Sequence, residues 1–266
     1  MSTLASDVRE MLHEQLEYRE LLMQMTRRDL LLRYKQTIMG FGWAIFMPLV
    51  NTAVFSVVFT RVAPIDTGVP YPLFAYCGLL CWNFFASSLR FSVGSLTSNS
   101  SLVTKVYFPR EIFPFSAVIV SLVDFAVGSL VLFGLMAYYR VWGGPALLFL
   151  PLVLLVHIIF TMGVSLMLAM ANLFYRDVKY LFEVVITVWM FASAVLYPLN
   201  VLGSRATQLS AINPMTPILN AYRNVLLYGR SPLTPEFGVA AALAVATLAI
   251  GWLTFHRAEF QFAENV

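Results

Sequence analysis

Side chains that could perform acid–base, nucleophilic or metal chemistry are few in this sequence, and they are scattered. The three histidines lie far apart, at His13, His157 and His256. No lysine follows a glycine, so the chain lacks the Gly-Lys-Ser/Thr loop that holds phosphate in many ATPases. The motifs His-Glu-x-x-His and Gly-x-Ser-x-Gly are also absent, and acidic residues do not cluster. The sequence therefore predicts no catalytic residue, no metal site and no cofactor on this chain.

Asp124 is the one residue whose place in the sequence demands an explanation, because it interrupts a long apolar stretch. A charge in such a stretch is costly and is usually functional. Three interpretations stay open: a structural pair with a neighbouring helix or a second copy of the chain, a place on the wall of a pathway, or catalysis. We expect His157 to be a hydrogen-bonded interior residue rather than a relay. Cys77 and Cys81 are expected to be small buried thiols.

The composition places these residues in a membrane. Of 266 residues, 59% are hydrophobic and 12% are charged, whereas a soluble domain carries about 25% charged residues. The mean hydropathy is +0.77. These values exclude a disordered protein and a soluble nucleic-acid binder, and two cysteines exclude a disulfide scaffold. A net charge of +3 is too small to indicate a polyanionic partner, and we expect no nucleic acid to bind.

Charged residues divide the chain into long apolar segments. Each segment has at least the roughly 20 residues that a membrane-spanning helix needs, and none alternates as a barrel strand would. The sequence predicts an all-α integral membrane protein with six transmembrane helices, near residues 39–60, 72–92, 112–139, 146–173, 180–199 and 237–255. The domain boundaries are an interface segment 1–36, a transmembrane domain 37–257 and a tail 258–266.

Lys and Arg are distributed unequally between the two sides of these spans. Twelve of the 17 fall in the N-terminal segment, the loops 90–111 and 174–179 and the tail, and five fall on the other side. Because cytoplasmic loops carry the excess of basic residues, both termini are expected in the cytoplasm. No short cationic region leads directly into the first span, so we expect no cleavable signal peptide.

Three segments outside the spans have patterns of their own. The first 36 residues predict an amphipathic helix on the membrane surface, then a capping box at Thr26–Asp29 that opens a helix over 30–36. The loop 93–111 predicts a short cytoplasmic helix. Prolines break the segment 205–236 on the outer side, so short re-entrant helices near 206–228, interrupted at Asn213–Pro214, are expected to form a lid or gate.

Aromatic residues make up 15% of the chain. Most are expected to face lipid or to form interfacial belts. Flat rings also give stacking surfaces that suit a substrate sliding past in many registers, such as a sugar chain. The candidates near spans 1, 2 and 5 are Trp43, Phe46, Trp82, Phe84, Phe85, Trp189 and Tyr197.

Four motifs together resemble one known family. They are the residues 28–49 (RDLLLRYKQTIMGFGWAIFMPL), 108–114 (FPREIFP), 173–178 (LFYRDV) and 212–229 (INPMTPILNAYRNVLLYG). From about residue 8 to 257 the chain resembles the ABC-2 type permeases that export polysaccharides, namely the O-antigen, capsule and teichoic-acid permeases of the Wzm, KpsM and TagG type.

The resemblance implies a bacterial cytoplasmic (inner) membrane protein with specific partners. Two copies would form a homodimer with a channel between them, in contact with membrane lipids. Two copies of a separate ATPase subunit, which would hold the ATP and Mg, would dock from the cytoplasm. The resemblance places that docking near Arg27, Arg28, Lys105, Tyr107, Arg110, Arg176 and Asp177.

The resemblance also implies a lipid-linked glycan as the substrate. Its pyrophosphate headgroup is expected to be drawn to basic groups such as Arg33 and Lys35 at the cytoplasmic mouth. The outer gate is expected to involve Asn213, Pro214, Tyr222 and Arg223. An ABC-2 permease for a small molecule or drug is the alternative function. A membrane-embedded transferase or a channel is less consistent with the sequence, which lacks converging catalytic groups.

Overall fold

The computed structural model describes residues 13–35, 37–40, 42–105, 108–198 and 213–262, and within these residues the structure is helical. The described elements are α2 (Arg19–Tyr34), α3 (Gly42–Val57), α4 (Tyr71–Val93), α5 (Ser95–Ser98), α6 (Ser100–Lys105), α7 (Ile112–Tyr139), α8 (Leu150–Phe174), α9 (Val178–Ala192), α11 (Met215–Arg223) and α12 (Pro235–Ala258). Short irregular helical turns extend four of them: η1 (Val58–Val62), η2 (Gly144–Phe149), η4 (Asn224–Tyr228) and η5 (Glu259–Gln261).

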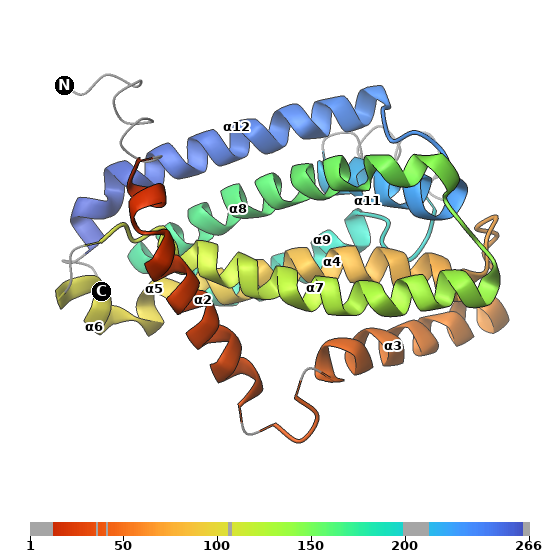
Figure 1. Cartoon of the computed structure of the whole chain (residues 1–266), viewed down its shortest axis with the longest axis horizontal. Coiled ribbons are helices and arrows are strands. Elements are labelled where there is room, and N and C mark those ends of the chain that lie inside the picture. The colour runs from red at the N-terminus through yellow and green to blue at the C-terminus, as the bar shows by residue number, and fades with distance from the viewer. Residues whose placement is uncertain (1–12, 36, 41, 106–107, 199–212, 263–266) are drawn as a thin grey trace.

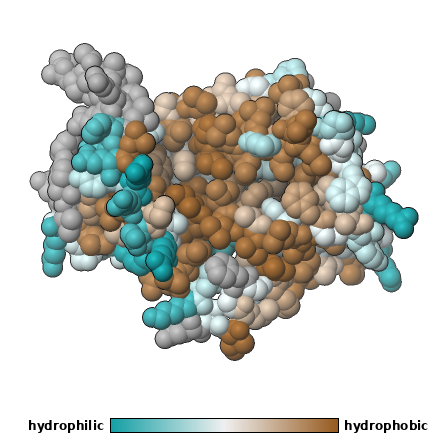
Figure 2. Space-filling model, in the orientation of Figure 1, coloured by the Kyte–Doolittle hydropathy of each residue, from teal (hydrophilic) through white to brown (hydrophobic). Residues whose placement is uncertain are grey.

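The long helices form one bundle with two distinct ends. The short helices α5 and α6 lie at one end with the C-terminal turn, and α11 lies at the other (Figure 1). We call these the α6 end and the α11 end. Figure 2 shows brown apolar side chains over the middle of the bundle and teal polar side chains toward its ends. This distribution is the one a membrane imposes, because apolar surface faces lipid and polar groups stay in water.

Five helices among the described residues are long and apolar enough to cross a membrane: Gly42–Val62, Tyr71–Val93, Ile112–Tyr139, Gly144–Phe174 and Pro235–Ala258. They confirm five of the six predicted spans as helices. The predicted span 180–199 differs. Its helix, α9, has 15 residues, so it is about 22 Å long at 1.5 Å per residue, shorter than the hydrocarbon core of about 30 Å.

Helix α9 ends at Ala192, and a turn follows it. Ser193 donates backbone hydrogen bonds to Trp189 O and Met190 O, and Ala194 has a left-handed backbone with φ of 52°. Residues 193–196 are nonetheless buried. The apolar composition of the predicted span 180–199 indicates a continuous helix. Packing of residues 193–196 against the bundle favours the turn instead.

The centre of the bundle is α4: in its apolar stretch 83% of the residues are buried, against 11% in the apolar stretch of the helix Gly42–Val62. Helices α3, α7, α8, α9 and α11 all pack around α4. Helices α8 and α12 approach each other closely at Gly163. A Cβ added to this glycine would lie 2.6 Å from the backbone nitrogen of Leu248.

The N-terminal helix differs from the prediction in two ways. Helix α2 continues without a break through residues 26–29, and Thr26 Oγ1 donates to Leu22 O within it, so the predicted capping box is wrong. The apolar stripe also packs partly on the chain itself: Leu22 and Met25 contact a cluster at the α6 end. Residues 1–12 lie outside the described residues. The loop helix predicted for 93–111 is two short helices, α5 and α6.

Candidate functional site

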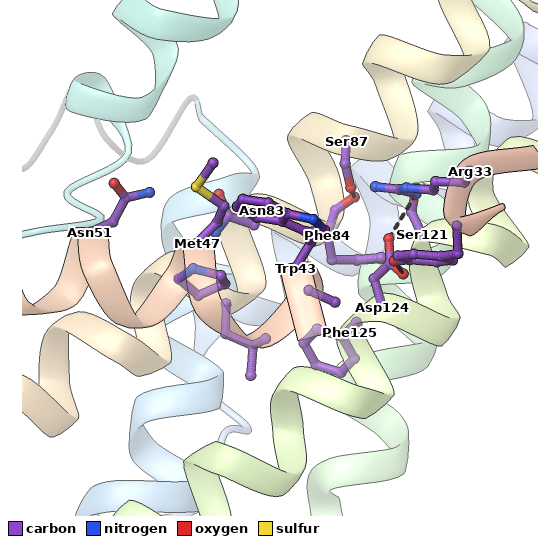
Figure 3. Close-up of a pocket in the computed structure, with 14 residues that line it drawn as sticks. Arg33, Trp43, Met47, Asn51, Asn83, Phe84, Ser87, Ser121, Asp124 and Phe125 are labelled. Atoms are coloured by element: carbon purple, nitrogen blue, oxygen red, sulfur yellow. Dashed lines mark hydrogen bonds and ion pairs between the residues drawn. The ribbon is translucent and has the colours of Figure 1, made fainter. Parts of the chain in front are cut away.

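A cavity of about 540 Å³ opens between α2, α3, α4 and α7, and it contains the charged group that the sequence singled out. Figure 3 shows Asp124 of α7 and Arg33 of α2 pointing toward one another at one side of it. Rings and aliphatic side chains form much of the remaining wall. The polar side chains on the wall come from three helices: Asn51, Asn83, Ser87 and Ser121.

Asp124 is paired on both of its oxygens. Arg33 Nη1 lies 2.7 Å from Asp124 Oδ2, and the hydroxyl of Tyr34 donates to Asp124 Oδ1. The Arg33 guanidinium also lies 4.2 Å from the centre of the Phe91 ring. Arg33 is the basic residue in the last turn of α2, which ends at Tyr34, and α3 begins at Gly42. The geometry therefore anchors the end of α2 to the apolar part of α7, as the structural interpretation of Asp124 expects, while the pair also lines the cavity.

The polar groups of the cavity can bind a ligand. Its amides and hydroxyls can donate and accept hydrogen bonds, and Trp43 offers an aromatic ring, 39% exposed. Among the described lining residues, the carboxylate of Asp124 is held by Arg33 and by the hydroxyl of Tyr34.

A second hollow, of about 440 Å³, lies next to the first at the α6 end. Three basic side chains line it, Arg33, Arg90 and Lys179, together with the carboxylate of Asp29. Arg90 is bound in two places to Glu183, with Nε–Oε1 at 2.9 Å and Nη2–Oε2 at 3.1 Å. Sequence reasoning missed Arg90 and Lys179 at this position. Both belong to the predicted cytoplasmic side, at the ends of the loops 90–111 and 174–179, which was the available signal.

The two residues predicted to attract the headgroup have different surroundings. The charge of Arg33 is largely compensated by Asp124, whereas Lys35 is exposed just past the end of α2. Of this predicted pair, Lys35 has the exposed side chain. Lys179 is also exposed, and it lines the second hollow.

The predicted path aromatics fall into two groups. Trp43 and Phe46 on α3 are exposed and contact each other edge to face. Trp82, Phe84 and Phe85 on the central helix α4 are buried.

The buried rings pack on other rings of the same chain. Phe85 stacks on Phe160 with centroids 5.6 Å apart, and Trp82 meets Trp189 edge to face. Trp82 and Phe85 are 3% and 0% exposed, so they fill the core and present no open face in this conformation.

The residues predicted at the outer gate connect α9 to α11. Asn213 Oδ1 accepts from Trp189 Nε1 at 2.9 Å and from the backbone nitrogen of Met215 at 3.1 Å. Its Nδ2 donates to Ser193 Oγ at 2.8 Å. Pro214 follows and leads into the first turn of α11. One amide therefore fixes both the turn after α9 and the start of α11.

Arg223 has an unusual environment at the α11 end, where it is almost fully buried. Its guanidinium donates to Ala194 O at 3.1 Å and to Val195 O at 2.5 Å, and lies 3.7 Å from the centre of the Phe74 ring. The carbonyls that the turn leaves without helical partners are thus satisfied by a charged donor. A Cβ on Gly78 would lie 2.4 Å from Val195 O, so α4 needs glycine there.

The other interior predictions also have defined positions. His157 is buried and its Nδ1 lies 3.4 Å from the hydroxyl of Tyr222. This contact agrees with an interior hydrogen-bonded histidine. Cys77 and Cys81 are free and buried on α4. Tyr197 donates its hydroxyl to Phe191 O, which holds the segment after α9 against that helix.

The residues that the resemblance places at an ATPase surface lie at the α6 end. Arg27, Lys105, Arg176 and Asp177 are exposed, and Tyr107 lies outside the described residues. Arg28 instead contacts Asp29 and, through Nη2, Asn99 Oδ1 at 3.0 Å.

Arg110 is bound within the chain. Its backbone nitrogen donates to Glu259 Oε1 at 2.9 Å, and its Nη1 donates to Glu259 O at 3.0 Å. Burial and the nearby Glu111 carboxylate raise the pKa of Glu259 to about 7. Arg110 therefore joins the loop before α7 to the turn after α12.

Comparisons with known proteins agree with this architecture. The family model described as ABC-2 type transporter matches residues 20–227. An O-antigen export system permease protein RfbA of Myxococcus xanthus is 29% identical over 259 residues, which cover 96% of this chain and 99% of that protein. Two proteins of Klebsiella pneumoniae with the same name are 26% and 27% identical, each over 92% of this chain and 94% of their own length.

Proposed function

Because the chain belongs to the ABC-2 type transporter family, we propose that it is the membrane permease of an ABC transporter that exports a lipid-linked polysaccharide of the O-antigen class. The observation that carries this function is similarity over nearly the whole chain to three permeases named for O-antigen export. A small-molecule or drug permease is the alternative, and the names of these relatives favour the polysaccharide.

ATP hydrolysis belongs to a separate subunit in this proposal. The sequence has no Gly-Lys-Ser/Thr phosphate loop, which supports an ATPase partner that holds the ATP and Mg. Two copies of that partner dock at the α6 end. The exposed residues Arg27, Lys105, Arg176 and Asp177 contact it, and the internal bonds of Arg28 and Arg110 hold the docking surface in shape.

The α6 end faces the cytoplasm in this proposal, in an inner membrane. It carries Arg90, Lys105 and Lys179, and the excess of Lys and Arg in the loops of this side supports the orientation. Helix α9 and the segment 193–198, which is buried over 193–196, make the sixth crossing. Helix α9 follows the end of α8, at the α6 end, and α11 lies at the opposite end (Figure 1).

Two copies of the chain assemble with the exposed apolar faces of α3 and α9 toward one another. Val54 and Val57 on α3 and Val184 and Val188 on α9 are each more than half exposed. A lipid-facing surface has the same composition, so the support comes from position: α3 lies at the edge of the bundle and borders the cavity that holds Asp124 (Figure 1). The glycan passes between the copies, along Trp43 and Phe46.

The hollow at the α6 end receives the pyrophosphate of the lipid-linked glycan. Lys179, Arg90 and Arg33 line it, and Lys35 lies two positions after Arg33, just past the end of α2. Basic side chains suit a polyphosphate because each charged hydrogen bond is stronger than a neutral one. The α11 segment, fastened through Asn213 and Arg223, is the outer gate.

Reconstitution with the ATPase in proteoliposomes tests the proposal. We expect a lipid-linked O-antigen-type glycan to stimulate ATP hydrolysis and to be translocated in an ATP-dependent manner. The paired substitutions Lys35→Gln and Lys179→Gln should reduce this stimulation and leave the basal hydrolysis intact, whereas Arg140→Gln, an exposed cation at the other end, should change neither. Absence of stimulation by any lipid-linked glycan, with a drug stimulating instead, would overturn the main function in favour of the alternative.

A further inference from the structure

Three ionisable side chains from distant parts of the chain meet at the α6 end. Glu111 immediately precedes α7, His256 lies in the last turn of α12, and Glu259 lies in the following turn η5. One ligand atom from each, the Nδ1 of His256 and a carboxylate oxygen of each glutamate, lies within 4.8 Å of the other two. Their side chains are 14%, 1% and 13% exposed for His256, Glu111 and Glu259.

Glu111 is the unusual member of this cluster. Among the residues that the structure describes, neither of its carboxylate oxygens has a hydrogen-bond partner, although the side chain is almost fully buried. A buried carboxylate costs several kcal/mol unless a proton or a cation compensates it. His256 forms an ion pair with Glu111 Oε1, at 3.5 Å, only while its imidazole is protonated. With a neutral imidazole, the position of Glu111 calls for a cation that its oxygens and His256 can share.

The distances within the cluster are those of ligands around an ion. His256 Nδ1 lies 3.5 Å from Glu111 Oε1 and 3.9 Å from Glu259 Oε2. Both distances exceed the 2.7–3.2 Å typical of an N–H···O hydrogen bond. Two ligands bound tetrahedrally at about 2.1 Å from a Zn²⁺ ion are about 3.4 Å apart. The observed spacing is close to that edge and needs only small side-chain movements to reach it.

We propose that Glu111, His256 and Glu259 bind a divalent cation of the zinc class at the α6 end. One imidazole and two carboxylates are a donor set that zinc accepts, and the fourth position is left to water or another side chain. The partial exposure of His256 and Glu259 gives the ion a way in. The sequence does not indicate this site, because Glu111 and His256 lie 145 positions apart in the chain.

The surroundings of the cluster fit a bound cation. Arg110 donates its backbone N–H to Glu259 Oε1 at 2.9 Å, which orients that carboxylate as an outer-shell partner does in metal sites. The carboxylate of Glu14, in the helical residues 13–17, interacts electrostatically with His256. The N–H of Arg110 fixes the orientation of Glu259, and the Glu14 carboxylate adds negative potential at His256. The Arg110 guanidinium, whose Nη1 lies 3.4 Å from Glu259 Oε1, pairs with that oxygen and leaves Oε2 to face His256.

A cation at this position would fasten the start of α7 to the end of α12. These two segments lie beside α5, α6 and Arg110, where the proposed ATPase contacts the chain. The site would thus hold the third predicted span to the last one at the surface that receives force from the partner. It does not require the permease to export any particular substrate, so its test stands apart from the transport assay.

Cobalt(II) is the probe for this site, because it replaces zinc and absorbs visible light when bound in a tetrahedral N/O site. The full chain, purified without a polyhistidine tag and stripped with a chelator, is titrated with Co²⁺. We expect one Co²⁺ per chain, displacement of its absorption by Zn²⁺, and a higher unfolding temperature with the metal. Loss of an outer-shell partner weakens metal affinity about 10–100-fold. His256 and Glu111 are proposed as direct ligands, so His256→Gln and Glu111→Gln should each weaken Co²⁺ binding by more than about tenfold.

Two further variants separate ligation from damage to the fold. His13→Gln removes an exposed histidine that pairs with Glu17 outside the cluster, and it should bind Co²⁺ as the wild type does. His256→Cys should retain binding and add a thiolate-to-cobalt charge-transfer band, which only direct ligation produces. The proposal is overturned if the wild-type chain takes up no stoichiometric Co²⁺, or if His256→Gln binds it as tightly as His13→Gln.

Discussion

The pair of Arg33 and Asp124 gives the sharpest prediction about the fold. Arg33 Nη1 lies 2.7 Å from Asp124 Oδ2, and the two side chains are 23% and 14% exposed. At that distance and an effective dielectric constant of about 20, the Coulomb attraction is about 6 kcal/mol. Desolvation of both charges offsets most of it, so the net value of the pair is small while the cost of removing one partner is large.

Asp124→Asn should therefore destabilise the chain strongly. It leaves the Arg33 guanidinium in the cavity with no carboxylate, and arginine cannot lose its proton. Breaking a buried pair costs about 3–5 kcal/mol, and partial exposure places this pair near the lower end, at about 3 kcal/mol. With about 2–4 °C per kcal/mol, the unfolding temperature should fall by about 6–12 °C. Arg33→Gln should cost less, because Asp124 keeps its hydrogen bond from Tyr34 and can neutralise by taking up a proton.

The assay is a double-mutant cycle on thermal unfolding of the purified protein. The variant with both Arg33→Gln and Asp124→Asn should lose less stability than the two single variants added together, with a coupling of about 1–3 kcal/mol. The exposed pair Arg90 and Glu183, 49% and 47% exposed, is the matched control and should show coupling below about 1 kcal/mol. An Asp124→Asn variant within about 2 °C of wild type, or strictly additive losses, would refute the reasoning.

Three further substitutions, with Gly134→Ala as a control, test close packing and the connection of α9 to α11. Gly78→Ala would place its Cβ 2.4 Å from Val195 O, so we expect a loss of several °C, whereas Gly134→Ala meets nothing within 4 Å and should not lower the unfolding temperature. Gly163→Ala should separate α8 from α12 and reduce folded yield, seen by size-exclusion chromatography, because its Cβ would lie 2.6 Å from backbone. Asn213→Ala should free the indole nitrogen of Trp189 and shift the tryptophan emission; an unchanged spectrum would count against that bond.

Much of the architecture follows from charge spacing alone. The intervals between charged residues predicted 112–139 and 72–92 as spans, and the helices are Ile112–Tyr139 and Tyr71–Val93. These predictions succeed because a membrane imposes one simple requirement, an uninterrupted apolar length. The same requirement does not register a turn inside an apolar segment, so the sequence indicated one span where α9 ends at Ala192.

Local patterns were weaker guides where tertiary contacts compete with them. The Thr26–Asp29 pattern is typical of a helix start, but α2 passes through it because Asp29 accepts from Ser116 Oγ of α7 instead. Aromatic residues were assigned to a path from their abundance. The burial of Trp82 and Phe85 depends on α4 being the central helix, which no periodicity within that span reveals.

What the sequence by itself determined is the membrane class, most of the spans and the family, because these depend on composition and on motifs local to each element. Only the tertiary structure decided which charges meet. Arg33 and Asp124 lie 91 positions apart, and Arg110 and Glu259 lie 149 apart. In an apolar interior an ionisable group must find a partner, and helix packing rather than chain order determines which partner is within reach.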